Sequence, residues 1–408
     1  MRRARFIFIL VLGICGVSFL LGCGGSNKTP PNTITTSGSN VVPIAVNSGP
    51  GASSGFPYAN GAFATVKVCI PGSSTCQSID GVLVDTGSFG LRILSSLVTI
   101  SLPQEQASDG NSMVECLNFL ASYTWGPVQM ADVEIGGEKA SSVPVQILSD
   151  TDFEAPASCT SVSGGASADT LATLGANGIL GVGQLPQDCG INSTCPASAN
   201  QYYSCPSSTG ACTPVAATVA QQVPNPVALF PTDNNGVIIE LPAVPGAEAT
   251  ASGSLVFGIG TESNNSLGSA TVYPVSLSSA HPLDFSTTFN GNDYDDSFID
   301  SGSNAYFFPD TSIIQCPIDS GAYGFYCPNN TTSLSATNGG NTGSGKVTFS
   351  VGNAILLFSN SADAAFGDLG GPANNYFDWG LPFFYGRNVF TSIAGTTAPG
   401  GATPYWAY

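Results

Sequence analysis

Two short segments place an acidic side chain in the same local context twice: Asp85-Thr86-Gly87-Ser88 and Asp300-Ser301-Gly302-Ser303. Each follows an apolar run typical of a buried strand, residues 81–84 and 297–299, and each begins a tight turn. One such tetrad alone fits an ordinary turn in which Asp hydrogen-bonds the backbone after a strand. As a pair, 215 residues apart (300 − 85), they predict a duplicated unit that brings two carboxylates to one site. Two carboxylates that share a proton can activate a water molecule.

A glycine that follows apolar residues comes after each tetrad. Gly181 lies 96 residues beyond Asp85 (181 − 85), and Gly386 lies 86 residues beyond Asp300 (386 − 300). This order resembles the pepsin-like aspartic proteases. In that family each lobe carries Asp-[Thr/Ser]-Gly-[Ser/Thr] and, later, a hydrophobic-hydrophobic-Gly strand that threads beside it. The resemblance covers residues 55–395.

The resemblance implies an all-β fold with two pepsin-like lobes and a cleft between them that binds a peptide or protein substrate without a cofactor. Asp85 and Asp300 would form the catalytic pair and hold a water molecule between them. Neighbouring residues would support the pair. Gly87 and Gly302 would let backbone N–H groups approach the carboxylates closely, and Ser88 and Ser303 would donate hydroxyl hydrogen bonds to them. Thr86 and Ser301 would form hydrogen bonds across the lobes, and Gly181 and Gly386 would pack against the two turns.

Two departures from the family leave a second function open. The family closes a Tyr-bearing flap over its substrate, whereas here the corresponding segment, residues 122–127, is short and offers Tyr123 or Trp125. Arg92 stands where the family usually has an aromatic residue. An Arg near Asp85 would lower its pKa and disturb proton sharing, unless Arg92 points to solvent or pairs with another acid. The alternative function is a non-catalytic surface lipoprotein that serves as a binding or structural envelope module.

The N-terminus predicts export. Residues 1–22 combine a basic start with a short apolar stretch, as in a lipoprotein signal peptide, and Leu-Leu-Gly-Cys at its end resembles the bacterial lipobox. Lipidation of Cys23 would anchor the protein in the membrane of the cell envelope, and we expect the outer membrane because Gly24 follows. A plain secretory signal cut elsewhere is the alternative. We expect a flexible tether over 23–55, an N-terminal β lobe over 56–245 and a C-terminal β lobe over 246–408.

Composition supports an all-β exported protein. The 408 residues include 49 Gly and 28 Pro, and only 9% are charged, which is typical of many short strands and turns. Cleavage after residue 22 would leave six Lys and Arg (9 − 3) against 27 Asp and Glu, a net charge of −21 (6 − 27). So acidic a chain is unsuited to binding nucleic acid. We expect a monomer.

The cysteines predict disulfides. Apart from Cys15 and Cys23, ten cysteines remain, an even number in an exported chain. Short spacings favour four pairs, which leaves a fifth: Cys69–Cys76, Cys189–Cys195, Cys205–Cys212 and Cys316–Cys327, with Cys116–Cys159 remaining. A zinc site is disfavoured because the chain has no C-x-x-C motif and a single histidine, His281.

Overall fold

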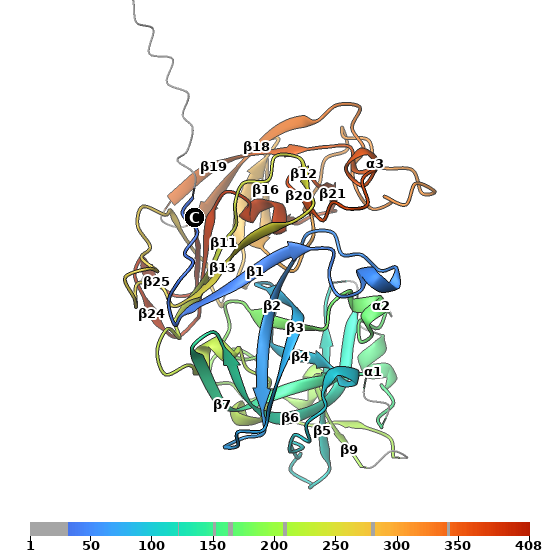
Figure 1. Ribbon diagram of the computed structural model, residues 1–408, viewed down its shortest axis with the longest axis vertical. Helices are drawn as coiled ribbons and strands as arrows, with labels where there is room; N and C mark the ends of the chain where they lie inside the picture. The colour runs from blue at the N-terminus through green and yellow to red at the C-terminus, as the bar shows by residue number, and fades with distance from the viewer. Residues whose placement is uncertain are drawn as a thin grey trace, which may run out of the picture. The chain divides into compact units, whose positions relative to one another are not determined.

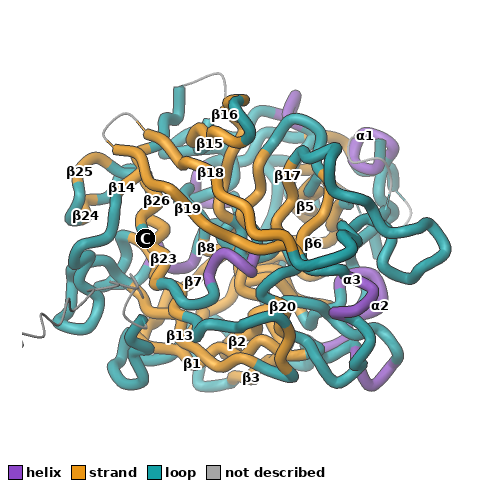
Figure 2. The backbone as a smooth tube through the Cα atoms, turned by 90° about the horizontal axis from the view of Figure 1, so that it is seen from above, coloured by secondary structure: helices purple, strands orange, loops and turns teal. Residues whose placement is uncertain are grey.

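The computed structural model describes residues 32–120, 122–149, 152–161, 166–206, 210–278, 282–340 and 343–408. Strands dominate this part of the chain, and every helix in it has only three or four residues (Figure 2). The predicted all-β class is confirmed, with 43% of the described residues in strands and 9% in helices. In the described part of the chain, no helix combines the length and apolar character needed to cross a membrane. The predicted signal peptide and Cys23 lie outside the described residues.

Six strands of the first half close into a barrel, with the order β6-β7-β4-β8-β3-β2 and a further β6–β2 pairing. Alternating apolar residues build its core: in β2, Val66 and Val68 are buried and Lys67 between them is exposed. The barrel strands are β2 (Gly61–Cys69), β3 (Cys76–Asp85), β4 (Phe89–Leu94), β6 (Tyr123–Ile135), β7 (Glu138–Leu148) and β8 (Gly178–Val182). Beyond β6 the sheet continues through β5 (Ser112–Asn118), β9 (Tyr202–Cys205) and β10 (Thr213–Pro214).

Seven strands of the second half form a half-barrel in the order β19-β18-β15-β16-β22-β17-β21. Its core is aromatic: Phe349 and Phe377 contact each other, and both also contact Phe308 and Trp379. The strands are β15 (Phe285–Phe289), β16 (Asn292–Ile299), β17 (Tyr306–Phe308), β18 (Thr332–Gly340), β19 (Gly343–Val351), β21 (Gly370–Pro372) and β22 (Phe377–Trp379).

A run of six strands continues the barrel sheet beyond β2, and both halves belong to one compact unit of residues 31–408. Figure 1 shows β1, β11 and β13 of this run. In order, its strands are β1 (Val41–Asn47), β13 (Ala251–Phe257), β11 (Gly236–Glu240), β23 (Asn388–Ser392), β26 (Tyr405–Ala407) and β14 (Val272–Pro274). Two short pairs complete the strands: β12 (Ala247–Glu248) with β20 (Ala365–Phe366), and β24 (Thr397–Ala398) with β25 (Gly401–Ala402).

The helices are single turns between strands. They comprise α1 (Ala157–Thr160), α2 (Leu171–Leu174), α3 (Ala354–Leu357), η1 (Ala52–Ser54), η2 (Ser95–Leu97), η3 (Ala197–Ala199), η4 (Val219–Gln221), η5 (Pro226–Leu229) and η6 (Leu381–Phe384).

The predicted tether, residues 23–55, needs correction in its described part. Residues 41–47 form β1, which pairs with β2 on one side and β13 on the other. Upstream, Asn32 Nδ2 donates to the carbonyl oxygen of Leu241 at 2.8 Å. The flanking Gly, Ser and Asn residues concealed the period-two pattern of β1, whose buried positions are Val42, Ile44 and Val46. The predicted boundary between residues 245 and 246 separates β11 from β13, although these strands pair directly.

A five-strand unit occurs twice with the same pairing pattern. In the barrel, β3 is antiparallel to β2 and parallel to β8, and β4 is antiparallel to β8 and parallel to β7. In the half-barrel, β16 is antiparallel to β15 and parallel to β22, and β17 is antiparallel to β22 and parallel to β21. Asp85 ends β3 and Asp300 directly follows β16. The repeat therefore gives the two acids equivalent positions.

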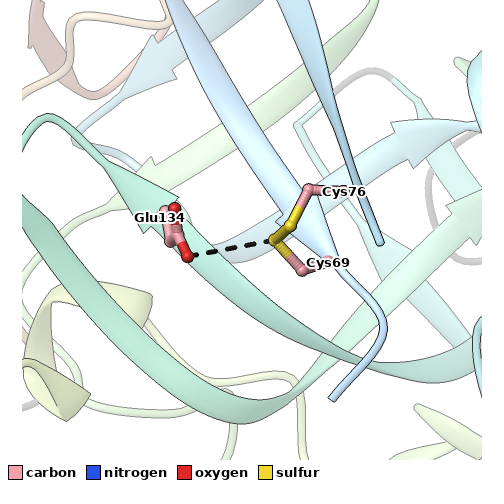
Figure 3. A group of neighbouring side chains, drawn as sticks. All are labelled: Cys69, Cys76 and Glu134. Atoms are coloured by element: carbon pink, nitrogen blue, oxygen red, sulfur yellow. Dashed lines mark hydrogen bonds between the residues drawn. A yellow bond between two sulfur atoms is a disulfide. The ribbon is translucent and has the colours of Figure 1, made fainter. Parts of the chain in front are cut away.

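All five predicted disulfides are present: Cys69–Cys76, Cys116–Cys159, Cys189–Cys195, Cys205–Cys212 and Cys316–Cys327. Figure 3 shows one of them beside Glu134, whose Oε1 lies 3.9 Å from Cys69 Sγ. This Cys-Cys-Glu cluster has the composition of a metal site. Both sulfurs are bonded to each other, however, so neither is a thiolate ligand, and the Glu134 carboxylate pairs with Lys67 at 2.7 Å.

Candidate active site

Each tetrad folds into a turn that holds its own carboxylate. In the first, the Gly87 N–H donates to Asp85 Oδ1 at 2.8 Å, and the Ser88 hydroxyl donates to Oδ2 at 2.5 Å. In the second, the Gly302 N–H donates to Asp300 Oδ1 at 2.7 Å, and the Ser303 hydroxyl donates to Oδ2 at 2.8 Å. The same two donors thus fix each carboxylate, as predicted for Ser88 and Ser303.

Thr86 and Ser301 join the two turns through four reciprocal hydrogen bonds. The Thr86 N–H donates to Ser301 Oγ at 3.0 Å, and the Ser301 N–H donates to Thr86 Oγ1 at 3.0 Å. The Thr86 hydroxyl donates to the Ile299 carbonyl at 3.0 Å, and the Ser301 hydroxyl donates to the Val84 carbonyl at 2.7 Å. These bonds are buried and hold the two turns in a fixed position relative to each other. The predicted hydrogen bonds of Thr86 and Ser301 between the two units are therefore present.

Gly87 and Gly302 each lie against the carboxylate of the opposite turn. A Cβ on Gly87 would come 2.7 Å from Asp300 Cγ, and a Cβ on Gly302 would come 2.6 Å from Asp85 Oδ1. Neither glycine has a positive φ, so close approach rather than backbone conformation explains these two residues. Their missing side chains let the carboxylates of Asp85 and Asp300 face each other.

The glycine prediction is right for the first unit and wrong for the second. Gly181 pairs with Asp85 in the parallel β3–β8 ladder and packs against the backbone of Phe89. In the second unit, the parallel β16–β22 ladder pairs Ile299 with Trp379. The next residue on each strand then brings Gly380 beside Asp300. A Cβ on Gly380 would meet the Ser303 carbonyl at 2.7 Å. Gly386 lies beyond this strand.

The environment of Gly386 shows a different reason for a glycine at this position. It follows η6 and adopts a φ of +76°, and a Cβ added to it would meet Ala243 first, at 3.3 Å. Its glycine requirement therefore comes from a left-handed turn, not from contact with the turn that carries Asp300. The apolar residues before Gly386 belong to a buried 3₁₀ helix, which in sequence is indistinguishable from a short buried strand.

Burial and the neighbouring carboxylate change the acidity of the pair. Burial of the Asp85 side chain, followed by the charge of Asp300, raises the pKa of Asp85 from 3.8 to about 8. The hydrogen bonds from Ser88 and Gly87 act in the opposite direction. A raised pKa on one member means that the pair retains a shared proton near neutral pH.

This pKa predicts how stability depends on pH. Between about pH 4 and pH 8 the folded protein keeps a proton on Asp85 that the unfolded chain releases, so stability falls as pH rises through this window. We expect the Tm of the native protein to fall over this range, and Asp85→Asn to remove a contribution of about one proton from the slope. Asp80→Asn, on an exposed position of the same strand, is the control. Parallel Tm profiles for native protein and Asp85→Asn would refute the assignment.

Arg92 is not part of the pair. Its guanidinium is fully buried, donates to Glu115 Oε1 at 2.7 Å and lies 3.4 Å from Asp188 Oδ1. The Tyr202 hydroxyl donates to the other Asp188 oxygen at 2.5 Å. Arg92 therefore does not point to solvent but pairs with other acids, which was one of the two alternatives. The network links β4 to β5, which carries Glu115, and to the Cys-rich segment that carries Asp188.

A cavity of about 840 Å³ contains both carboxylates. Its walls include Leu83 and Ile179 from the barrel and Phe298 and Phe307 from the half-barrel. A buried acid, Asp85, and a half-buried one, Asp300, among apolar walls are typical of a site that orients a ligand by a few polar groups.

The flap prediction is wrong in its residues. The β5–β6 hairpin does reach the cavity, but through its turn, where Phe119 and Leu120 line the space. The Phe119 N–H closes this turn by donating to the Ser122 carbonyl at 2.7 Å. Tyr123 and Trp125 do not line the cavity. Trp125 is instead buried against Tyr203 and donates to the Phe153 carbonyl at 2.9 Å.

Tyr58 belongs to the candidate site although no local sequence pattern predicts it. Its side chain lines the cavity, and its hydroxyl donates to the Gly302 carbonyl at 3.4 Å. Burial, then the charges of Asp85 and Asp300, raise the pKa of Tyr58, so its hydroxyl stays protonated. No local motif marks Tyr58, because it reaches the acids only through the loop between β1 and β2.

Comparison with curated proteins found no match. A family profile, by contrast, covers nearly all of the described residues, including both tetrads, Gly380 and the β5–β6 hairpin. With residues 36–408 matched, the chain belongs to the family described as "Protein of unknown function (DUF3443)".

Proposed function

We propose that this protein is an aspartic peptidase with a two-lobed, pepsin-like architecture, in which Asp85 and Asp300 activate water. The observation that carries the proposal is the pair of carboxylates in a duplicated unit, locked by the reciprocal Thr86–Ser301 bonds. The ionised carboxyl takes a proton from water while the protonated one donates to the scissile carbonyl oxygen. A tetrahedral diol results, without a covalent enzyme intermediate, and collapses to acid and amine.

The proposed substrate is an extended peptide. A cavity of about 840 Å³ accommodates several residues. The apolar walls at Leu83, Ile179, Phe298 and Phe307 favour apolar side chains beside the cleaved bond, while backbone hydrogen bonds would supply affinity that depends little on sequence.

The proposed activity extends to near-neutral pH. An Asp85 pKa of about 8 lets the pair hold its shared proton where an unperturbed Asp would have lost it. Such a pH range suits an enzyme of the bacterial envelope. We propose that location, through the Cys23 anchor and with the catalytic domain facing the periplasm or the exterior.

Digestion of a denatured protein mixture between pH 3 and 8 tests the function. The purified protein should cut it, and a statine-type peptide analogue, which mimics the diol, should inhibit. A folded, oxidised protein that cuts nothing at any pH would contradict the peptidase proposal. Tight binding of the peptides without cleavage would support the alternative, a non-catalytic binding lipoprotein. The pairing of Arg92 with Glu115 and Asp188 removes one of the two observations that suggested this alternative.

The flap hairpin offers a separate prediction. Replacing both Phe119 and Leu120 by Ala should lower kcat/KM by about tenfold or more, because the cavity loses its apolar cover over the substrate. Leu120 is 74% exposed, so its truncation should leave Tm almost unchanged. Tyr123→Phe, which keeps the ring in place, is the matched control and should retain full activity. Loss of activity in Tyr123→Phe alone would return the flap role to Tyr123.

A further inference from the structure

Gln184 is a buried cavity residue whose side-chain amide has no hydrogen-bond partner. It is 2% exposed and lines the cavity that contains Asp85 and Asp300. Neither its Oε1 nor its Nε2 has a partner among the described residues. Burying a donor and an acceptor unpaired is unfavourable for folding. An amide retained in this state at a cavity wall is therefore available to a bound molecule.

The backbone of Gln184 is fixed on two sides. The preceding residue, Gly183, donates its N–H to the Ser88 carbonyl at 2.9 Å, and the Gln184 carbonyl accepts the Ala394 N–H at 2.8 Å. The first bond ties this segment to the turn that carries Asp85, and the second ties it to the residues after β23. Gln184 thus has a fixed place next to the acidic turn, as a ligand-binding residue requires.

The duplicated unit has an apolar residue at the same spacing. Gln184 stands three residues after Gly181, and Phe383 stands three residues after Gly380. Phe383 is fully buried in the apolar core and contacts Trp379. Phe383 is therefore satisfied by packing alone, whereas Gln184 carries an amide into a similarly buried position. Packing does not explain this amide.

Trp406 brings a second unpartnered donor to the same cavity. It is 3% exposed, it lines the cavity, and its Nε1 has no partner in the described part of the chain. Trp406 lies in β26 and pairs with Thr391 of β23. Ala394, which bonds Gln184, follows Thr391 by three residues. The two unpartnered side chains therefore come from neighbouring parts of the fold.

The unpartnered groups match a neutral amide. Gln184 Oε1 can accept from an N–H, and Gln184 Nε2 and Trp406 Nε1 can donate to carbonyl oxygens. An anion would be repelled by Asp85 and Asp300, and none of the described residues that line the cavity is Lys or Arg. A cation would leave both donors unpaired. An amide, by contrast, offers an N–H and a carbonyl oxygen together, either in the main chain of a peptide or in an Asn or Gln side chain.

We infer that Gln184 binds an amide group of the substrate. Its Oε1 accepts the amide N–H, its Nε2 donates to the amide carbonyl oxygen, and the Trp406 indole N–H donates to a carbonyl oxygen of the same ligand. That this ligand is a peptide rests on the proposed function. A ligand without the amide would leave buried polar groups unpaired, so the site discriminates against it. Gln184 and Trp406 take no part in proton transfer.

Calorimetric binding of the statine-type peptide analogue tests this role. Gln184→Leu keeps the approximate volume and removes both polar groups, so it should raise Kd by about tenfold or more. Tm of the ligand-free variant should equal or exceed that of the native protein, because an unpartnered amide is no longer buried. Gln187→Leu is the matched control, since Gln187 is also buried with an unpartnered Nε2 but does not line the cavity. It should keep the native Kd. An unchanged Kd in Gln184→Leu would overturn the inference.

Two series of analogues distinguish the main chain from a side chain as the source of the amide. In the first series, an ester replaces one main-chain amide at a time, and in the second, one side chain at a time is changed from Leu to Gln. An ester that weakens binding to the native protein but not to Gln184→Leu would assign the main chain to Gln184. A Gln side chain that strengthens binding to the native protein alone would assign the side chain. Equal effects on both proteins throughout would overturn the inference.

Tryptophan fluorescence supplies a readout that needs no activity. Of the three tryptophans, only Trp406 lines the cavity, so the analogue should shift the emission of the native protein but not that of Trp406→Phe. The same shift in both proteins would overturn the role of Trp406. Should Gln184→Leu not fold, Trp406→Phe is the second variant, and it should raise Kd by about threefold or more.

The outcomes separate this inference from the peptidase function. A protein that cleaves no peptide, but binds peptides more weakly in Gln184→Leu, would refute the peptidase and leave Gln184 as inferred. Peptide cleavage with native binding in Gln184→Leu would do the reverse. A folded protein that neither cleaves nor binds peptides would overturn both.

Discussion

Substituting Asp85 or Asp300 by Asn should reduce the proposed peptide cleavage by at least about a thousandfold, because one member of the pair can no longer exchange a proton with water or substrate. The fold should persist. An Asn carbonyl oxygen can accept the Gly87 or Gly302 N–H in place of Oδ1, and the Thr86–Ser301 bonds do not involve the acids. Tm at neutral pH should be equal to or above that of the native protein, because the buried Asp85 carboxyl beside Asp300, with its raised pKa, opposes folding there.

Initial rates on a quenched peptide identified from the digest, measured beside Tm, check this expectation. Asp80→Asn is the control, since Asp80 lies on the same strand as Asp85 but is exposed. It should keep the native rate. Full turnover in Asp85→Asn or in Asp300→Asn would exclude the proposed chemistry, whatever the stability of the variant.

The second large effect concerns the glycine that faces Asp85. In Gly302→Ala, the added methyl would sit 2.6 Å from Asp85 Oδ1 and 3.1 Å from Asp300 Oδ1. These distances are below van der Waals contact, so the carboxylates must move apart. A shift of this kind should lower kcat by about a hundredfold, since the two groups must hold one water between them. Because the φ of Gly302 is not positive, the loss would come from the contact and not from backbone strain.

Gly339→Ala is the matched control for this steric effect. Its added methyl would meet only the Ser286 carbonyl, at 3.8 Å, which is ordinary contact. Cleavage and Tm should remain native in Gly339→Ala, while Gly302→Ala should lose cleavage and also shift the Tm–pH profile assigned to Asp85. Native activity in Gly302→Ala would mean that the two carboxylates do not need their close approach.

Local sequence patterns predicted the fold class, the disulfides and the two acidic turns. The all-β class follows from short alternating runs with glycine-rich turns, which act over a few residues. Four disulfides follow from cysteines close in sequence, and the fifth then follows by elimination. The tetrads at Asp85 and Asp300 could be recognised because strand, acid and turn are adjacent along the chain, and a repeated local pattern implies a repeated local structure.

Strand pairing decided what the local pattern could not. Gly380, rather than Gly386, threads beside Asp300 because of the β16–β22 register, and the acid at Asp378 interrupts the apolar run that would have marked this strand. The position of the turn in the β5–β6 hairpin decided that Phe119 and Leu120, rather than Tyr123 or Trp125, line the cavity.

Long-range contacts decided the remaining site residues. Arg92 pairs with Glu115 and Asp188 instead of with Asp85 or Asp300. These two partners lie 23 and 96 residues away from Arg92 in the sequence. Tyr58 reaches the turn of Asp300 from a separate loop and hydrogen-bonds the Gly302 carbonyl there. A sequence specifies which residues prefer strands and turns, but contacts between distant residues depend on the register of the assembled sheets, where shifting a strand by one residue moves its side chains to the opposite face.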